Sequence, residues 1–583
     1  MKSTVTFRSY AAILSLVLPI GSLAWLIVPI TYGQAAEPDL PRDRVAGEAP
    51  GKHTQQPAPT GHLETPDQPP APASPRRISP PPVVTRGGFV SVQVNVDELG
   101  NNMVGDAANE PSIAVDPTNP NVIVIGWRQF DSIASSFRQA GWAYSHNAGR
   151  TWTFPGVLEP GVFRSDPVLD CDSEGNICYY SLQGDFLCDL FKSADGGVSW
   201  DGPLFAYGGD KAWMIVDKTD SVGHGHHYVS WSRYGNNYYP NQFTRSTDGG
   251  TTWLYPVQIP PLQPMWGTLA VDLDGNLYIG GYDYPTDMMI VAKSTNAKLA
   301  DQTPTFDFSL YVDLGGPLVF QAAPNPGGLL GQLWLAVDQS DGPTAGNVYM
   351  LASVDPTGPD PTDVMFVRSE DGGQTWSSPV RVNDDPPGTN AWQWFGTMSV
   401  APDGRIDAVW NDTRNSGQAN ICELFYASST DGGVTWSENI PLSPPFNSHL
   451  GWPQQDKLGD YYHMVSDVVG ANLAWAATFN GEQDVYFLRI GDFDCNGNGI
   501  GDAEDLASGT SDDSNGNGIP DECDCLGDLN GDWMVDLTDL ATLLSNYGTT
   551  SGASYEDGDI DGDGDVDLAD LAALLSNYGM TCP

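Results

Sequence analysis

The octet Ser246-Thr-Asp248-Gly-Gly250-Thr-Thr252-Trp253 decides the fold, because it recurs along the chain. Related octets begin at Ser193, Ser369, Ser429 and, with Asn in place of Asp, at Ser145. Asp and Ser side chains hydrogen-bond the backbone of a tight turn, and Gly supplies the positive φ that such turns require. The final Trp fits the first core residue of the next strand. Each octet therefore predicts a hairpin turn between two β-strands.

A second repeat precedes the octets and sets the number of units. It consists of an apolar strand, usually an Asp, a Gly or Asn turn, and another apolar strand. Its seven copies begin at Ile113, Val168, Met214, Leu269, Leu335, Met398 and Met464. Units of four short strands with this period are typical of propeller blades. The sequence thus predicts a mainly β protein with a seven-bladed propeller over residues 88–490; six blades are the alternative.

The last unit is incomplete, and an earlier segment fits the gap. The seventh unit ends after its third strand, from Asp484 to Ile490. The segment from Gly88 to Val96 alternates with period two and stands just before the first unit. Pairing between these two segments would close the ring and cover a sheet edge. We predict that the N-terminal strand completes the last blade.

The octets resemble the Asp-box, or bacterial neuraminidase, repeats of sialidases and related propellers. The resemblance extends from Gly88 to Ile490 and implies an Asp-box β-propeller. It says little about activity, because such repeats are turn scaffolding. The family includes sialidases, other glycosidases, receptors and non-enzymatic proteins.

Blade topology predicts where a site would lie. In a four-stranded antiparallel blade, the first–second and third–fourth turns share one face, and the octets occupy it. The second–third loops and the blade connections open on the other face. That face is expected to carry these substrate-binding residues: Arg128, Arg164, Arg233, Arg414, Trp231, Trp392, Trp394 and Trp410. Aromatic platforms beside charged groups suit a sugar ligand. Bracing of neighbouring blades is the alternative role for each residue.

The sialidase resemblance also implies catalytic groups. Sialidases use three Arg for the substrate carboxylate, a Tyr nucleophile with a Glu partner, and an Asp acid/base. The four Arg above could supply the first set. Tyr461 or Tyr462, with Glu110 and Asp166, could supply the others. The Arg-Ile-Pro motif that sialidases carry before the first Asp box is missing.

A different glycosidase could use paired carboxylates instead, such as Asp166 with Asp412 or Asp460. The sequence therefore predicts glycan recognition, with hydrolysis of O-glycosyl bonds left open. A non-catalytic surface adhesion or assembly protein is the alternative.

The C-terminal part carries an unusual charge. From Gly491 to Pro583 there are 22 acidic residues and no Lys or Arg. Two twelve-residue loops there place oxygen ligands at the spacing that Ca²⁺ prefers. Their ligands are Asp528, Asn530, Asp532, Asp536 and Asp539, then Asp559, Asp561, Asp563, Asp567 and Asp570. Each loop leads into a short amphipathic segment.

This loop–helix pair resembles a type I dockerin, over residues 526–583. The resemblance implies calcium binding and attachment to a cohesin-type scaffold protein, in the service of polysaccharide breakdown. One departure is Trp533, which stands where the first loop needs Gly. That loop is expected to bind calcium more weakly than the second.

Residues 491–525 resemble thrombospondin type 3 calcium repeats. The expected ligands are Asp494, Asn496, Asn498, Asp502 and Asp505, then Asp513, Asn515, Asn517, Asp521 and Asp524. A solvated acidic linker is the alternative interpretation of this segment.

The N-terminus predicts export. Lys2 and Arg8 precede an apolar run from Ala11 to Ile30, and small residues follow up to Ala36. This order is typical of a secretory signal peptide over residues 1–36; an uncleaved membrane anchor is the alternative. Residues 37–87 are Pro-rich and read as a linker. A secreted or cell-surface protein can form disulfides, and we expect Cys495–Cys523 and Cys525–Cys582.

Composition excludes one class of partner. The 583 residues include 25 Lys plus Arg against 74 Asp plus Glu, a formal net charge of −49. A chain this acidic repels phosphate backbones, so nucleic-acid binding is not expected.

Overall fold

The computed structural model describes residues 83–513, 518–523, 526–530 and 534–580. The predicted signal peptide and the linker up to residue 82 lie outside the described residues. So do Asn515, Asn517, Asp524, Asp532 and Trp533, as well as the predicted Cys525–Cys582 pair. Among the described residues, no helix has both the length and the apolar character that crossing a membrane requires.

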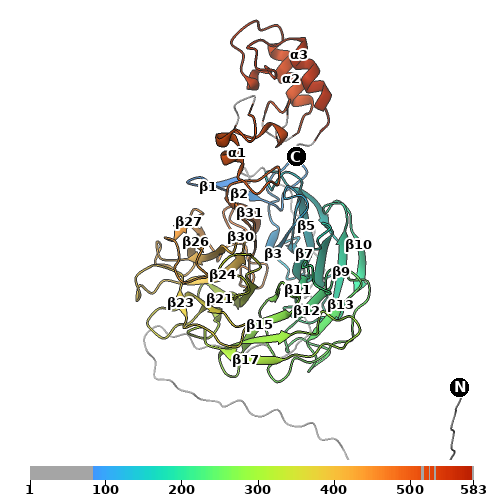
Figure 1. The fold of residues 1–583 in the computed structure, drawn as a ribbon. Helices are drawn as coiled ribbons and strands as arrows, with labels where there is room; N and C mark the ends of the chain where they lie inside the picture. The colour runs from blue at the N-terminus through green and yellow to red at the C-terminus, as the bar shows by residue number, and fades with distance from the viewer. Residues whose placement is uncertain (1–82, 514–517, 524–525, 531–533, 581–583) are drawn as a thin grey trace, which may run out of the picture. The chain divides into compact units, whose positions relative to one another are not determined.

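Seven antiparallel sheets make up a propeller, as predicted (Figure 1). Blade 1 holds β3 (Ala107–Val115), β4 (Ile123–Phe130), β5 (Gln139–Ser145) and β6 (Thr153–Val157). Blade 2 holds β7 (Ser165–Cys171), β8 (Ile177–Leu182), β9 (Cys188–Ser193) and β10 (Asp201–Phe205). Blade 3 holds β11 (Trp213–Val216), β12 (His227–Ser230) and β13 (Phe243–Ser246). Blade 4 holds β14 (Leu269–Val271), β15 (Leu277–Asp283), β16 (Met288–Ser294) and β17 (Phe308–Val312).

The remaining blades follow the same plan. Blade 5 holds β20 (Trp334–Val337), β21 (Val348–Val354), β22 (Asp363–Ser369) and β23 (Val380–Arg381). Blade 6 holds β24 (Gln393–Val400), β25 (Ile406–Asp412), β26 (Ile421–Ser429) and β27 (Ile440–Pro441), with β28 (Phe446–Asn447) beside β26. A hairpin of β18 (Phe320–Ala322) and β19 (Asn325–Leu329) is inserted between blades 4 and 5. Each of the seven predicted unit starts lies in the first strand of its blade.

The N-terminal segment closes the ring, which confirms the prediction. Blade 7 holds β29 (His463–Ser466), β30 (Gly470–Ala477) and β31 (Asp484–Gly491), and its fourth strand is β2 (Phe89–Gln93). In the β2–β31 ladder, Ser91 faces Leu488 and Gln93 faces Tyr486. An additional outer strand, β1 (Val83–Arg86), pairs with β2 and was not expected from the sequence.

The octets form turns after the third strand of five blades. In one of them, the Ser369 hydroxyl donates to Asp371 Oδ1 at 2.8 Å and accepts from the Gly373 N–H at 2.8 Å. Asp371 also accepts from the backbone N–H and the hydroxyl of Thr375. In the variant octet, Asn147 Oδ1 accepts from the Thr151 N–H at 2.9 Å, while its amide group donates to the Thr151 hydroxyl. The side chains therefore replace the backbone hydrogen bonds that the turn lacks.

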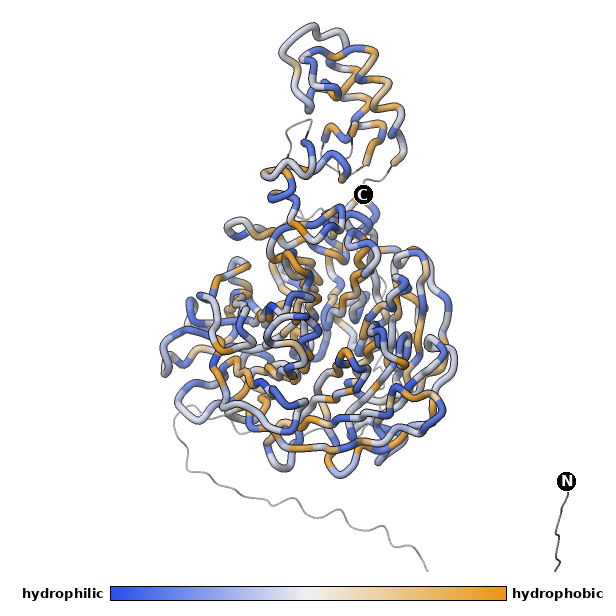
Figure 2. Tube along the Cα trace, in the orientation of Figure 1, coloured by the Kyte–Doolittle hydropathy of each residue, from blue (hydrophilic) through white to orange (hydrophobic). Residues whose placement is uncertain are grey.

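Apolar residues concentrate along the strands, and polar residues along the loops (Figure 2). The inner strands supply buried aliphatic side chains such as Ile113, Leu269 and Met464. Aromatic residues fill the space between blades; for example, the rings of Trp142 and Trp200 meet edge to face at 6.4 Å. The fold thus places its core in the strands and leaves the loops to build sites.

The C-terminal part contains the short helices α1 (Asp502–Ser508), α2 (Leu537–Asn546) and α3 (Leu568–Asn577) and the 3₁₀ turns η1 (Asp521–Cys523) and η2 (Tyr555–Asp557). Asp536 and Asp567 cap α2 and α3 with the same reciprocal hydrogen bonds. Leu543 and Leu574 pack in one small core. The two predicted loop–helix units therefore share one local structure.

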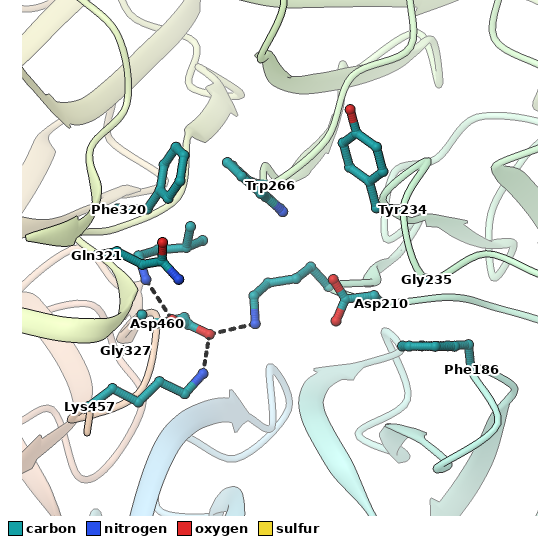
Figure 3. A pocket seen from close by; sticks show the side chains of 13 residues that line it. Phe186, Asp210, Tyr234, Gly235, Trp266, Phe320, Gln321, Gly327, Lys457 and Asp460 are labelled. Carbon is teal, nitrogen blue, oxygen red and sulfur yellow. Dashed lines mark hydrogen bonds and ion pairs between the residues drawn. The ribbon is translucent and has the colours of Figure 1, made fainter. Parts of the chain in front are cut away.

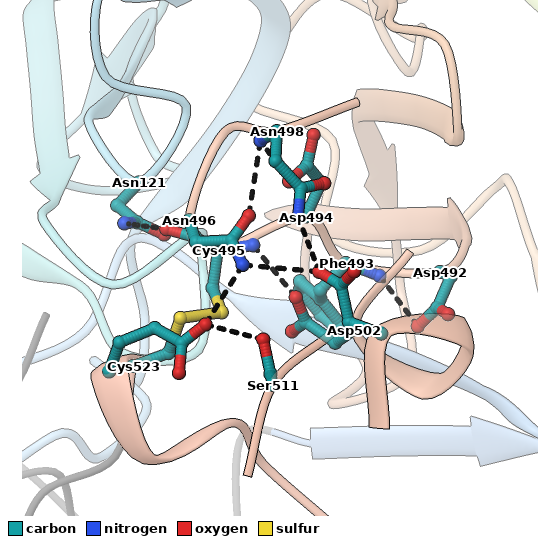
Figure 4. The surroundings of a disulfide bond; sticks show 12 residues. Asn121, Asp492, Phe493, Asp494, Cys495, Asn496, Asn498, Asp502, Ser511 and Cys523 are labelled. Carbon is teal, nitrogen blue, oxygen red and sulfur yellow. Dashed lines mark hydrogen bonds between the residues drawn. A yellow bond between two sulfur atoms is a disulfide. The ribbon is translucent and has the colours of Figure 1, made fainter. Parts of the chain in front are cut away.

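One disulfide lies between Cys495 and Cys523, as predicted, with Cα atoms 5.9 Å apart (Figure 4). Cys171, Cys178, Cys188 and Cys422 are buried free thiols in the propeller.

Candidate functional site

A ring of strained residues marks the entry to the inner strands. Glu110, Asp166, Lys211, Trp266 and Phe395 are not glycine, yet they have φ between 44° and 60°. Each stands at the same chain distance before the first–second turn of its blade, in blades 1, 2, 3, 4 and 6. A non-glycine residue in this region costs about 1–3 kcal/mol, and such residues gather at functional sites. This repeated strain indicates where the candidate site lies. It is the face of the propeller that carries the second–third loops and the blade connections, near the propeller axis.

A break in the strand ladder accompanies the strain. The β3–β4 register shifts between Asn109 and Ser112, and the β7–β8 register shifts between Ser165 and Val168. A bulge of this kind turns a side chain away from its normal direction in the strand. It frees the Glu110 and Asp166 side chains from the regular alternation of the sheet.

Asp460 is the centre of a buried charge network (Figure 3). Its Oδ2 lies 2.5 Å from Nζ of Lys211 and 2.6 Å from Nζ of Lys457, while its Oδ1 accepts from the Leu329 N–H at 2.7 Å. Burial opposes ionisation of Asp460, but the two ammonium groups outweigh burial and hold its pKa well below the usual range. Asp460 is therefore an anion at neutral pH.

Glu110 lies beside this network with a different protonation behaviour. Its carboxyl is fully buried, 3.1 Å from Nε of Arg128 and 3.2 Å from Nζ of Lys457. Burial raises the pKa of Glu110 to about 7, although Arg128 and Lys457 oppose the rise. Two neighbouring carboxyl groups thus differ at neutral pH: Asp460 is ionised, and Glu110 is partly protonated.

Asp166 fixes the backbone that carries Lys211. Its Oδ2 accepts from the Lys211 N–H at 2.9 Å, and its Oδ1 accepts from the Ser165 hydroxyl at 2.9 Å. Burial would raise the pKa of Asp166, but Lys211 and then Arg128 lower it to about 2. Asp166 therefore positions Lys211 with both a hydrogen bond and a permanent negative charge.

A cavity of about 210 Å³ opens above Asp460, as Figure 3 shows. Its walls include the aromatic side chains of Phe186, Tyr234, Trp266 and Phe320. These residues come from second–third loops, a blade connection and the β18–β19 hairpin, so the cavity lies on the face predicted from topology. Aromatic walls above a charged floor can pack on a sugar ring and hydrogen-bond its hydroxyls.

The structure brings some of the predicted residues together here. Asp460 lines the cavity, while Glu110, Asp166 and Arg128 support it from below. Tyr461 is buried, and its hydroxyl donates to the Pro167 carbonyl at 3.0 Å. Burial and then Glu110 raise the pKa of Tyr461 well above its usual value, which opposes a role as a phenolate nucleophile.

Other predicted charged residues lie elsewhere with partners of their own. Arg164 pairs with Asp189 at 2.8 Å, and Arg414 pairs with Asp412 at 2.8 Å. Asp412 also accepts from the Trp410 indole N–H at 2.9 Å. These contacts brace the loops of blades 2 and 6. They do not converge with Arg128 on one substrate carboxylate.

The fourth predicted Arg, Arg233, lies beside the cavity wall residue Tyr234. It lies over the Tyr234 ring at 5.0 Å and 3.6 Å from Asp283 Oδ1. The four predicted Trp platforms, in contrast, are buried core residues: Trp231, Trp392, Trp394 and Trp410. None of these four Trp lines the cavity, whose walls include Trp266 and Phe320.

Sequence reasoning missed several contributors to the cavity, among them Phe186, Lys457 and Phe320. Lys457 stands between Asp456 and Asp460, and a cation in so acidic a chain was an available signal. Phe320 comes from the inserted hairpin, which neither of the two repeats predicted. Its position followed only from the folded chain.

The second C-terminal loop gathers carboxylates. Asp559, Asp561 and Asp563 form one group whose oxygens lie within 4.8 Å of one another, and Asp565, Asp567 and Asp570 form another. Asp559 Oδ1 and Asp565 Oδ1 are buried and have no hydrogen-bond partner among the described residues. Hard oxygen donors with unfilled capacity fit a calcium ion.

The last Asp of both loops is positioned in the same way. Asp570 accepts from the N–H groups of Ile560 and Asp567, each at 2.7 Å. Asp539 accepts from Leu529 and Asp536 in the same pattern, each at 2.8 Å. Since Asp532 lies outside the described residues, the ligand set of the first loop is described only in part.

The upstream segment fits the predicted calcium pattern unevenly (Figure 4). Asp505 is fully buried and accepts from the amides of Asn496 and Asn498 at 3.1 and 2.7 Å. Asp502, in contrast, accepts from the Cys495 N–H at 2.8 Å and pairs with Arg150 at 3.5 Å. Asp494 caps the Gly499 N–H, and Asp513 caps the Gly518 N–H, each at 2.9 Å. Asp521 begins η1, where its N–H donates to the Asp512 carbonyl at 2.8 Å.

No family model and no curated protein matches the chain. Among solved structures, it is similar to a protein of unknown function from Dyadobacter fermentans, at 16% identity, covering 70% of this chain and 100% of that one with a TM-score of 0.38. It is also similar to the endosialidase of phage phi92, at 10% identity, 70% and 69% coverage and a TM-score of 0.39. A leech intramolecular trans-sialidase matches at 11% identity, 58% and 68% coverage and a TM-score of 0.35.

Proposed function

We propose that this protein is an exported glycan-binding protein whose ligand occupies the cavity above Asp460. The observation that carries the proposal is the combination of aromatic walls with a buried Lys211–Asp460–Lys457 floor. An aromatic face excludes water from a sugar ring, while charged donors and acceptors bind its hydroxyls strongly. The backbone strain of residues such as Lys211 and Trp266 opposes folding, and strain of this kind gathers at functional sites.

Hydrolysis of an O-glycosyl bond is the second candidate, and one observation favours it. Glu110 keeps a proton near neutral pH while Asp460 is ionised. Neighbouring carboxyl groups with separated pKa values are the arrangement that acid/base catalysis needs. For hydrolysis, Glu110 has to reach the bound sugar from its buried position beside Arg128. The non-catalytic adhesion or assembly role remains the alternative.

One experiment separates these functions. The full chain is tested for glycan binding and for product release on a panel of oligosaccharides that includes sialosides. Trp266→Ala and Asp460→Asn should each lower binding at least tenfold, because they remove a wall and the floor. Asp412→Asn is the matched control, since Asp412 braces a loop of blade 6 away from the cavity.

The outcomes distinguish the candidates. Product release that disappears in Glu110→Gln, with binding retained, would establish hydrolysis. Binding without product release would establish a lectin-like protein. Absence of binding to every glycan, or equal loss in Asp412→Asn and Trp266→Ala, would contradict the proposal.

For the C-terminal part, we propose calcium binding and attachment to a cohesin-type scaffold protein. The proposal is supported by the orphan carboxylate oxygens of the second loop and by apolar side chains on both helices. Leu537 and Leu568 are each 67% exposed, and Leu544 and Leu575 are exposed at equivalent positions. Exposed apolar side chains on so small a unit indicate a protein contact.

A secreted or cell-surface location completes the proposal. It rests on the signal-like residues 1–36 and on the Cys495–Cys523 disulfide, which fits an oxidising compartment.

A further inference from the structure

The ring of blades is closed at one seam, between the N-terminal strand β2 and the last blade. Beyond the end of β2, the Val94 N–H still donates to the Val485 carbonyl at 2.8 Å. At the next position the Asn95 side chain bonds the same residue in place of the backbone, since its Oδ1 accepts from the Val485 N–H at 3.0 Å. Across the same seam, the Ala108 N–H of blade 1 donates to the Gln483 carbonyl at 2.7 Å. Residues 93–108 and 480–486 therefore hold the propeller closed.

Three carboxyl groups are buried in this seam. Asp484 is fully buried, and Asp106 and Glu482 are at least nine-tenths buried. The amide group of Asn95 donates to Asp484 Oδ1 at 2.9 Å and reaches Asp106 Oδ2 at 3.5 Å, so one amide lies between two acids. Glu482 accepts from the Asn102 amide at 2.9 Å and from the Gly105 N–H at 2.7 Å.

The partners of these acids are neutral. Gln129 donates to Asp106 at 2.8 Å, and Asn480 donates to Asp484 at 3.3 Å. Within the described part of the chain, no Lys, Arg or His forms an ion pair with Asp106, Glu482 or Asp484. Asp106 Oδ1 is buried and has no hydrogen-bond partner there. An ionised carboxyl group that is buried without a cation is energetically costly. Such a group usually keeps its proton and stays neutral.

The pKa shifts of the buried acids also favour their neutral forms. Burial, followed by the charge of Glu482, raises the pKa of Asp106 to about 8. Burial and then Asp106 raise the pKa of Asp484 well above its usual value. The titratable groups that face this pair from the last blade are Glu482 and Tyr486; Asn95 and Gln129 face it from the N-terminal segment and from β4.

We infer that the seam is a proton-held latch: Asp106 and Asp484 are neutral acids in the closed propeller, and rising pH loosens the N-terminal strand from the last blade. This device concerns the closure of the ring and does not depend on the ligand of the cavity.

The sign of the effect follows from proton binding. In an opened seam, Asp106 is exposed and ionises near pH 4; in the closed seam it ionises near 8. Between these pH values the closed form binds one more proton at Asp106, and Asp484, whose pKa is also raised, acts in the same direction. Each unit rise in pH in the Asp106 window therefore favours opening by up to about tenfold, and the effect levels off once Asp106 is ionised in the closed form.

Hydrogen–deuterium exchange on the full chain tests the latch directly. Exchange of peptides covering residues 89–96 and 484–491 is followed from pH 5 to 8 in EDTA, after correction for intrinsic exchange and relative to β15 as an internal reference. The wild type should show seam opening that grows with pH. Asp106→Asn cannot ionise and should reduce this growth by up to tenfold per unit. Asp484→Asn should act in the same direction, and the exposed Asp341→Asn is the matched control.

Two results would overturn the inference. Equal pH dependence in wild type, Asp106→Asn and Asp484→Asn would show that these carboxyls are already ionised in the closed seam. Alternatively, added calcium at pH 8 could close the seam in the wild type and fail to do so in Asp106→Asn. That result would show a cation, and not a proton, neutralising the cluster.

Discussion

Lys211 and Asp460 form a buried ion pair between residues far apart in the sequence, with 2.5 Å between Nζ and Oδ2. Lys211 precedes blade 3, and Asp460 precedes blade 7. Because Lys457 approaches the same Oδ2 at 2.6 Å, a single carboxylate holds both ammonium groups in place. The floor of the cavity is therefore a preorganised arrangement of donors and acceptors, so the proposed ligand would bind without further ordering of these side chains.

Replacement of Asp460 should be strongly destabilising. Asp460→Asn removes one of the two buried carboxylates that face Lys211, together with the buried counter-charge of Lys457, and breaking a buried ion pair costs roughly 3–5 kcal/mol. Urea denaturation at pH 7 measures the loss in the free energy of unfolding. Because Lys211 and Lys457 lower the pKa of Asp460, its contribution is present above about pH 4 and is lost as the pH falls below that value. The difference between variant and wild type should shrink accordingly at low pH. Asp403→Asn, at an exposed pair with Arg405, should change stability by less than about 1 kcal/mol.

Glu110 should make the wild type less stable as pH rises towards 7. Its pKa is about 7 in the folded chain and near 4.5 in the unfolded chain, so the folded chain binds the extra proton in between. Stability contributed by this proton is present at pH 4.5 and is lost by about pH 7. Glu110→Gln should flatten that part of the melting profile measured by calorimetry between pH 4.5 and 7.5. An unchanged slope in Glu110→Gln, equal to that of the exposed Glu438→Gln, would show that Glu110 is ionised throughout.

Replacing Asp371 of an octet turn should lower the stability of the fold less with Asn than with Ala. Asp371→Ala removes acceptors for the Ser369 hydroxyl and for Thr375, each worth about 0.5–1.5 kcal/mol. Asp371→Asn should cost less, because Asn147 already fills the equivalent position and bonds the same two groups of its Thr, with the hydroxyl bond reversed so that the amide donates. Thermal melts of both variants provide the comparison. The hydrogen bonds from Thr375 lower the pKa of Asp371 to about 2, so the acid stabilises the fold above about pH 4 and loses this effect as the pH falls towards 2. Equal melting temperatures for the Ala and Asn variants would contradict this account.

Calcium titration should show whether the second C-terminal loop, from Asp559 to Asp570, binds a calcium ion. In calorimetric titrations of the full chain, Asp570→Ala should bind one calcium ion fewer than the wild type, since it removes the carboxylate that organises the loop. Glu556→Gln, an exposed change in η2 outside the loop, should leave the stoichiometry unchanged. Identical titrations of Asp570→Ala and wild type would mean that this loop is not a calcium site.

What the sequence predicted well is local. The octets contain their own hydrogen-bond partners, so Ser369, Asp371 and Thr375 form the turn wherever the chain places them. The alternation of the segment from Gly88 to Val96 identified it as a strand, and the missing strand of the last unit indicated its partner. The seven copies of the second repeat predicted the seven blades, and the N-terminal segment predicted the ring closure.

What the sequence predicted poorly depends on three-dimensional neighbours. Asp412 and Arg414 read as site residues, yet they pair with each other and with Asp384 in one loop region. Trp394 and Trp410 lie close to strand ends, where a shift of one or two residues decides between an exposed platform and the core. Glu110 and Asp460 were identified, but their different protonation arises from burial and from Lys211 and Lys457. Lys457 is three residues from Asp460, whereas the connection before blade 3 brings Lys211 to both acids.

The closure of the ring also decides how the molecule bears mechanical load. The C-terminal part follows directly from β31, which is hydrogen-bonded to β30 on one edge and to β2 on the other. A pull on that part therefore enters an interior strand and acts along its length. Many bonds then resist together in shear, whereas a strand at the edge of a sheet would peel away one bond at a time. A protein tethered by its C-terminal part would thus transmit tension into the strongest position that its last blade offers.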